Sequence, residues 1–178
     1  MGGEEFLANE YPDAVRAKLA HEGKVENGKK MLCDGELLCG CLKVIALPGH
    51  SDDSAAVLDT RTNTLVCADC LQLWGIGKYG TGISFAKAYL ESIEKVRKLD
   101  VENIIASHNY APLGAYAIGK EAVGKYLDEC EKYIFVLKDF TEKHSDLAFD
   151  KMAELYNTEN PDLPRLGAHT FEAIAKEL

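Results

Sequence analysis

The chain has 178 residues, 47% of them hydrophobic, which is enough for one globular domain with a sizeable buried core. Its 20 basic and 29 acidic residues give a net charge of -9, which opposes phosphate backbones and anionic lipids. We therefore expect neither nucleic acid nor a membrane as a partner. The first residues lack the basic and apolar regions of a signal peptide, so a cytoplasmic location is expected.

The six cysteines favour a reduced protein rather than one held by disulfides. Most of them lie in apolar, strand-like runs, where a thiol behaves as a small hydrophobic group. The pairs Cys39/Cys41 and Cys67/Cys70 leave a four-cysteine zinc site open as an alternative. However, the first pair is C-x-C and 25 residues separate Cys41 from Cys67, so buried free thiols are favoured. The full set is Cys33, Cys39, Cys41, Cys67, Cys70 and Cys130.

The first third of the chain predicts one helix and then short strands. Residues 11–22 have helical spacing, and residues 30–33 and 36–38 are typical of short strands around a turn. Residues 41–47 form an almost continuous apolar run that Pro48-Gly49 ends, which predicts a buried strand followed by a tight loop.

The rest of the chain alternates strands with helices and then becomes helical. Two antiparallel strands are predicted over residues 55–59 and 64–68, a helix over 84–99 and a strand over 103–107. Further helices are predicted over residues 117–143, 147–156 and 168–178. This order favours a layered α/β domain.

Three residues with metal-binding side chains fall at or just beyond the ends of predicted strands. They are His50, Asp69 and His108. Strand ends in an α/β domain converge on one edge of the sheet, so residues distant in the sequence can form one site there. Imidazole and carboxylate groups together suit zinc, iron or manganese. Any one of these residues alone is more often an ordinary polar loop residue, and only their shared placement predicts a metal site.

The segments around these residues resemble motifs of the metallo-β-lactamase superfamily. LPGHSDDSAAVLD resembles the third metal-binding motif, with its Pro-Gly-His, and LVCADC resembles the apolar strand ending in Gly-Asp, with Ala68 replacing the glycine. IIASHNYAP resembles the final strand ending in Gly-His-Gly, with Ser107 and Asn109 replacing the glycines. The order of the motifs and the 19-residue spacing from His50 to Asp69 agree with the family, and the match runs from about residue 1 to 134.

The resemblance implies a fold, a cofactor and a class of reaction. The expected fold is one half of the αββα sandwich over residues 1–143, with a helical C-terminal extension over residues 144–178. His50 would bind one metal, Asp69 would bridge two and His108 would bind the second. The metal would be zinc, with iron or manganese as alternatives. A metal-activated water would attack an ester, thioester, lactone or related bond of a small-molecule substrate.

The leading motif of the family, HxHxDH, does not occur in these 178 residues. Because Met1-Gly2-Gly3 resembles the segment that follows this motif, the chain is expected to be an incomplete hydrolase that lacks several ligands. Weak metal binding and little activity are then expected. The alternative is a non-catalytic half-fold that acts in interactions, for example as a homodimer through an exposed sheet face.

The glycines Gly75, Gly77 and Gly80 spell GxGxxG between a strand and a helix, which suggests dinucleotide binding as a competing interpretation. That fingerprint also requires an acidic residue at the end of the next strand. The strand over 103–107 is followed by His108 instead. We therefore expect this segment to be a substrate-side loop.

Overall fold

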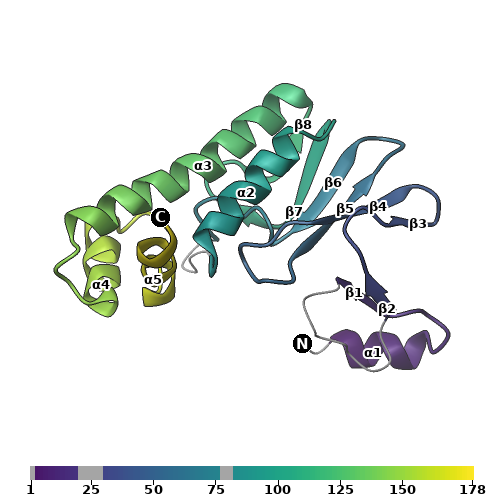
Figure 1. The fold of residues 1–178 in the computed structure, drawn as a ribbon, viewed down its shortest axis with the longest axis horizontal. Coiled ribbons are helices and arrows are strands. Elements are labelled where there is room, and N and C mark those ends of the chain that lie inside the picture. The colour runs from purple at the N-terminus through teal and green to yellow at the C-terminus, as the bar shows by residue number, and fades with distance from the viewer. Residues whose placement is uncertain (1–2, 20–29, 77–81) are drawn as a thin grey trace.

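A six-stranded mixed sheet forms the centre of the protein (Figure 1), in a computed structural model that describes residues 3–19, 30–76 and 82–178. Neighbouring strands are antiparallel, except that β6 and β7 are parallel and are joined through helix α2 (Ala86–Arg97). The strands lie in sequence order: β3 (Leu37–Leu38), β4 (Leu42–Ala46), β5 (Ala55–Asp59), β6 (Thr64–Ala68), β7 (Asn103–Tyr110) and β8 (Gly114–Ile118). The predicted α/β class is confirmed.

Helices α2 and α3 (Lys120–Lys143) cover one face of this sheet, and the core lies between them and the strands (Figure 1). Side chains of a strand alternate between the two faces, so every second strand residue enters this core. In β6, Leu65 and Cys67 are fully buried, whereas Val66 on the other face is 47% exposed. Hydrophobic periodicity thus sets which face of the sheet receives the helices.

The C-terminal helix α5 (Ala168–Glu177) packs against the far half of α3, and α4 (Phe149–Glu159) packs mainly against α5. Their aromatic side chains meet those of α3, with ring centroids 5.1 Å apart for Phe140 and Tyr156 and 5.7 Å apart for Tyr156 and Phe171. One hydrophobic cluster therefore crosses the predicted boundary between residues 143 and 144.

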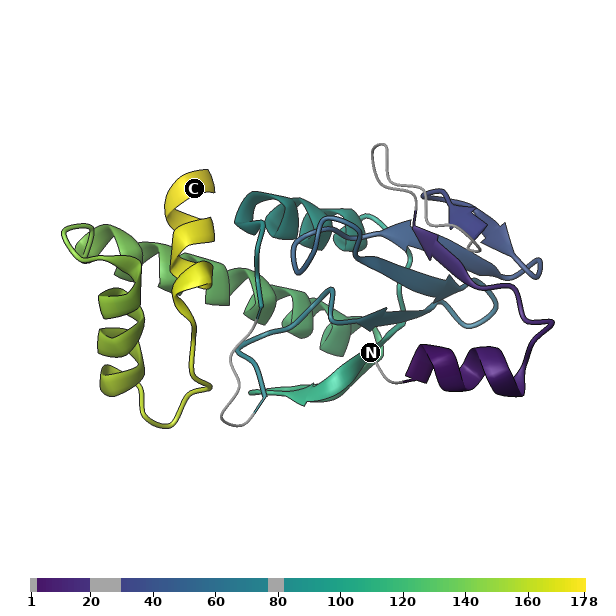
Figure 2. The same cartoon turned by 90° about the horizontal axis from the view of Figure 1, so that it is seen from below.

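The N-terminal segment differs from the sequence prediction. Helix α1 (Gly3–Glu10) ends before the predicted helix over 11–22 begins, and β1 (Ala17–Leu19) forms a parallel pair with β2 (Lys30–Leu32). Pro12 explains the helix end, because a proline disfavours the helical conformation of the residue before it. The prediction is wrong over residues 11–19, and its remainder lies outside the described residues. This segment lies on the side of the sheet away from α2 (Figure 2).

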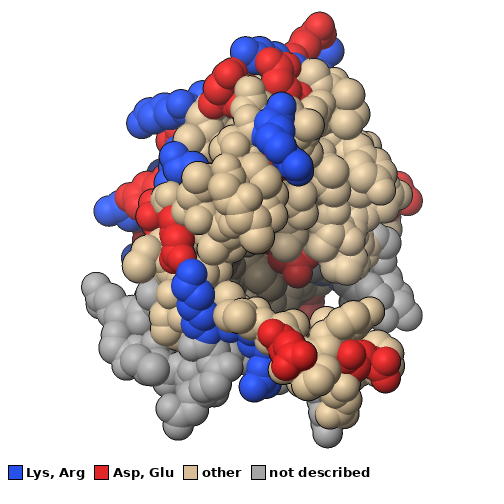
Figure 3. Space-filling view, turned by 90° about the vertical axis from the view of Figure 1, so that its right-hand side faces the viewer, with Lys and Arg blue, Asp and Glu red and all other residues tan. Residues whose placement is uncertain are grey.

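The face of the sheet away from α2 and α3 carries an apolar row. Strand pairing aligns one residue from each strand, in the order Val44, Val57, Val66, Ile105 and Tyr116. Val44 is buried, but Tyr116 is 66% exposed and Ile118, on the same face, is 69% exposed. Figure 3 shows a hollow between the main body and the N-terminal segment, bordered largely by uncharged surface.

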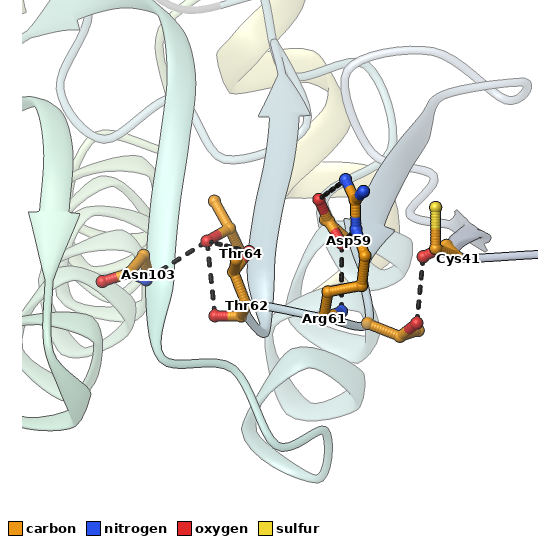
Figure 4. A network of polar contacts seen from close by, with 7 residues as sticks. Cys41, Asp59, Arg61, Thr62, Thr64 and Asn103 are labelled. Carbon is orange, nitrogen blue, oxygen red and sulfur yellow. Dashed lines mark hydrogen bonds and ion pairs between the residues drawn. The ribbon is translucent and has the colours of Figure 1, made fainter.

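At one end of the sheet, polar contacts fix the connection between β5 and β6 (Figure 4). Arg61 donates to both oxygens of Asp59, and Asn103 of β7 donates to Thr64 Oγ1 at 3.2 Å. Asn63 takes a positive φ of 49°, which asparagine tolerates in tight turns. This network aligns the beginnings of β6 and β7 and leaves their other ends for the candidate site.

Most other predicted elements are confirmed, with three differences. Strand β7 continues to Tyr110, so His108 lies inside the strand and does not follow it. Strand β8 was not predicted, and α3 begins at Lys120 instead of residue 117. The apolar run before α3 is too short for periodicity to separate strand from helix. In the described part of the chain, none of the helices has the length and hydrophobicity to cross a membrane.

Candidate metal centre

Strand direction brings the three candidate ligands to one edge of the sheet. Strands β4 and β6 are both antiparallel to β5 and therefore run in the same direction, and β7 is parallel to β6. The C-terminal ends of these three strands consequently lie at the same edge. His50 follows β4, Asp69 follows β6 directly and His108 lies near the end of β7.

Asp69 is held by two hydroxyl groups from β7. Ser107 Oγ and Tyr110 Oη both donate hydrogen bonds to Asp69 Oδ1, and the two hydroxyl oxygens lie 3.4 Å apart. His108 Nε2 lies 3.6 Å from the same carboxylate oxygen. Since a carboxylate oxygen has two lone pairs, the two donors occupy both acceptor positions of Oδ1.

The surroundings of Asp69 favour its ionised form. Partial burial raises its pKa, but the hydrogen bonds from Ser107 and Tyr110 and the nearby His108 and His50 outweigh this effect and lower the pKa. Burial, together with the bond to Asp69, raises the pKa of Tyr110 well above its usual range. Tyr110 therefore stays protonated and donates, and Asp69 stays charged and accepts.

His50 is oriented by the backbone of Gly82, which precedes α2. Its Nδ1 lies 2.6 Å from the Gly82 carbonyl oxygen. A carbonyl can only accept a hydrogen bond, so Nδ1 carries the proton, and in the neutral ring Nε2 keeps its lone pair. Histidines that bind metals commonly donate their other ring N–H to a backbone carbonyl in this way.

The Pro48-Gly49 loop is fixed to the start of α2. The amides of Ser84 and Phe85 donate to the Gly49 carbonyl at 2.9 and 3.0 Å, and Ser92 Oγ donates to the Pro48 carbonyl at 2.8 Å. Gly49 has φ +148°, and a Cβ there would lie 2.8 Å from Tyr89 Cα. A glycine before His50 is therefore required by this close approach.

Ala68 occupies the position where the resembling motif has glycine. Its φ is +46°, in the left-handed region that glycine adopts at little cost. The pairing of β6 with β7 also shifts register between Val66 and Ala68. The backbone therefore turns at Ala68 in the way a glycine would favour, and this turn aims Asp69 at β7.

The donor atoms fit a metal ion only in part. Two ligands of a tetrahedral zinc ion lie roughly 3.3 Å apart, at about 2.0–2.1 Å from the metal. The 3.6 Å from His108 Nε2 to Asp69 Oδ1 is close to that span. Within residues 3–19, 30–76 and 82–178, however, no three His, Cys, Asp or Glu side chains converge closely enough to hold a metal. The described residues bring two candidate ligands, Asp69 and His108, close together and place the oriented imidazole of His50 at the same edge of the sheet.

The competing cysteine and glycine sites receive no support. Cys67 and Cys70 are buried free thiols, whereas Cys39 is exposed, so these cysteines do not form one cluster. Burial raises the pKa of Cys70 to about 12, which disfavours a reactive thiolate. In the glycine segment, Gly77 and Gly80 lie outside the described residues.

Three residues of this site were not identified from the sequence. Tyr110 lies beyond the predicted strand, Gln72 lies in a loop, and Gly82 acts through its backbone carbonyl. Strand alternation would not have identified Tyr110, because residues three apart point to opposite faces of a regular strand. The irregular pairing of β7 with β8 between Ile105 and Tyr110 brings its hydroxyl to the same oxygen as that of Ser107. No sequence signal marks Gln72, because its partners are backbone groups and a distant tyrosine.

Comparisons with known proteins agree with this architecture. No family in a scan of protein families matches the chain. Among solved structures, a metallo-beta-lactamase family protein from Thermus thermophilus superposes with a TM-score of 0.56 and 18% identity, over 83% of this chain and 46% of that protein. A double mutant of the sec-alkyl sulfatase PisA1 superposes with a TM-score of 0.52 and 17% identity, over 77% of this chain and 24% of that protein.

The chain therefore has part of the metallo-β-lactamase fold, with a six-stranded mixed sheet and its flanking helices. It spans less than half the length of either solved structure. This confirms the fold expected from the sequence resemblance.

Proposed function

We propose that the chain belongs to the metallo-β-lactamase superfamily and contributes His50, Asp69 and His108 to the metal site of a hydrolase. The observation that carries this proposal is the pairing of Asp69 with His108, 3.6 Å apart, at the edge where His50 also lies. The Nδ1–H bond of His50 to Gly82, which leaves Nε2 available, supports the same assignment.

The proposed cofactor is zinc, with iron or manganese as alternatives, because imidazole and carboxylate ligands suit all three. When bound, such a metal supplies Lewis-acid activation of water for hydrolysis of an ester, thioester, lactone or related bond. Asp69 would contribute a charged carboxylate that Ser107 and Tyr110 orient. His50 and His108 would contribute neutral imidazole nitrogens. Because only three ligands are proposed in this chain, we expect weak binding by the chain alone.

Zinc binding by the untagged, metal-free chain tests this proposal. We expect titration calorimetry to detect zinc binding, and His50→Ala and His108→Ala each to weaken it at least about tenfold, since each removes a ligand. His169→Ala, near the start of α5, is the matched control and is expected to leave the affinity unchanged. Equal zinc affinity in all four proteins would contradict the ligand assignment.

The apolar row on the open sheet face favours a second candidate function, in which the chain acts as an interaction module that forms a homodimer. Tyr116 and Ile118 are 66% and 69% exposed there. They adjoin the other apolar side chains of the row, and a contiguous exposed apolar patch, unlike single exposed hydrophobic residues, marks an interaction surface. We expect a concentration-dependent dimer in light scattering, which Ile118→Lys abolishes because it places a charge in the interface. Val136→Lys, at an exposed position of α3, is the control. A monomer at all concentrations would refute this candidate.

A further inference from the structure

The Gln72 carboxamide, in the loop after Asp69, is one of the few buried polar side chains in the described residues. Its side chain belongs to a residue that is only 4% exposed. Its Oε1 accepts a hydrogen bond from the Gly82 amide at 2.9 Å. The carbonyl of the same glycine accepts the hydrogen bond from His50 Nδ1 at 2.6 Å. A continuous chain of contacts therefore links Gln72 to a proposed metal ligand.

Gln72 is itself fixed by α2. Its backbone amide donates to Tyr89 Oη at 3.2 Å, and Tyr89 is fully buried. The same tyrosine packs so closely on Gly49 that a Cβ at Gly49 would lie 2.8 Å away. Tyr89 thus anchors both the backbone before His50 and the residue that holds Gly82.

Gly82 allows the ring of His50 to approach closely. A Cβ on Gly82 would lie 3.1 Å from His50 Cε1 and 3.2 Å from Nδ1, tighter than an ordinary contact. The N–H and the carbonyl of Gly82 belong to two successive peptide groups that meet at its Cα. The hydrogen bond from the N–H to Gln72 and the close contact with the His50 ring together fix where Gly82 lies, and thereby where its carbonyl starts.

We propose that Gln72 is a positioning residue that fixes the tautomer and orientation of His50 through Gly82. By holding the Gly82 amide, Gln72 fixes the position of Gly82 beside His50, and the Gly82 carbonyl then keeps the proton on Nδ1. Nε2 then keeps a free lone pair at the edge of the sheet that carries Asp69 and His108. The use of that lone pair for a metal depends on the proposed function, but the tautomer itself does not.

Nitrogen-15 NMR of the histidine ring in the metal-free chain tests this inference. With the ring neutral, we expect His50 to carry its proton on Nδ1, the opposite of the preference of free imidazole side chains in water. Gln72→Met has a similar length but no amide acceptor. It is expected to shift the tautomer ratio toward Nε2–H by about tenfold, the equivalent of one hydrogen bond of about 1.4 kcal/mol.

Gln72→Glu is the conservative variant, because its side chain accepts the Gly82 amide in either protonation state and should keep the Nδ1–H form. Gly82→Ala is a second, independent variant that displaces the ring and should also reduce the Nδ1–H population. Circular dichroism of each variant verifies folding. An Nε2–H tautomer in the wild-type chain, or a ratio that Gln72→Met leaves unchanged, would overturn the inference.

Zinc titration of the same variants separates this inference from the proposed function. If the site binds zinc, Gln72→Met is expected to weaken binding about tenfold, and Gln72→Glu much less. A tautomer shift without zinc binding in any variant would support the role of Gln72 and refute the metal site. Zinc binding with no tautomer shift would refute the role of Gln72 alone.

Discussion

Replacing Gly49 with alanine is expected to lower the free energy of unfolding by about 3 kcal/mol or more. The added Cβ would lie 2.8 Å from both Cα and Cβ of Tyr89, so shortening that side chain cannot relieve the clash. At φ +148°, the backbone conformation also disfavours alanine. Either α2 or the loop before His50 must move, and we expect a large decrease in the midpoint of urea unfolding.

Substitutions at two other glycines separate the cost of the steric clash with Tyr89 from the cost of the backbone conformation. Gly40 has φ +74° but no atom within 4 Å of a built Cβ, so Gly40→Ala should cost only about 1 kcal/mol of backbone strain. Gly124, inside α3, is equally open, and Gly124→Ala should stabilise the protein by about 1 kcal/mol through helix propensity. A cost for Gly49→Ala no greater than that for Gly40→Ala would disprove the close packing on Tyr89.

Replacing Ser107 with alanine is expected to strengthen zinc binding about tenfold. Ser107 and Tyr110 occupy both lone pairs of Asp69 Oδ1, the oxygen nearest His108 Nε2. A metal that binds this oxygen must displace one hydroxyl, and a hydrogen bond to a charged group is worth about 1.5–3 kcal/mol. The Ser107→Ala substitution removes one of the two hydroxyl donors before the metal binds, so most of the free-energy cost of displacing a hydroxyl is no longer incurred.

Competition titration with a chromophoric zinc chelator measures this change. Tyr110→Phe removes the other donor and should also raise the affinity. Ser145→Ala, in the connection between α3 and α4, is the control and should have no effect. If Ser107→Ala instead weakens binding, Asp69 binds through Oδ2 and the hydroxyls only orient it.

The strand predictions were accurate in segments where a long apolar run or a regular alternation of apolar and polar residues was the only local pattern. The segment over 41–47 and the hairpin over 55–68 needed no tertiary information, because burial of one face already selects their register. The helix predicted over 11–22 is wrong over residues 11–19, because Ala17–Leu19 pairs with Lys30–Leu32 as a strand. Pro12 stands in the first turn of the predicted helix, where proline is tolerated, so the local pattern did not exclude a helix. Strand β8 is too short for its own pattern to define it, and its pairing with β7 decides its structure.

The sequence determined the identities of the three candidate ligands and the strands that carry them or precede them, because those follow from local patterns of apolar residues and turns. Only the tertiary structure decided which hydrogen bonds the side chains of these residues make. Strand direction gathers Asp69 and His108, and β7 continues past Ser107 so that two hydroxyls bind one carboxylate oxygen. The tautomer of His50 depends on Gly82 and, through it, on Gln72. These contacts involve backbone groups and residues distant in the sequence, so no local pattern encodes them.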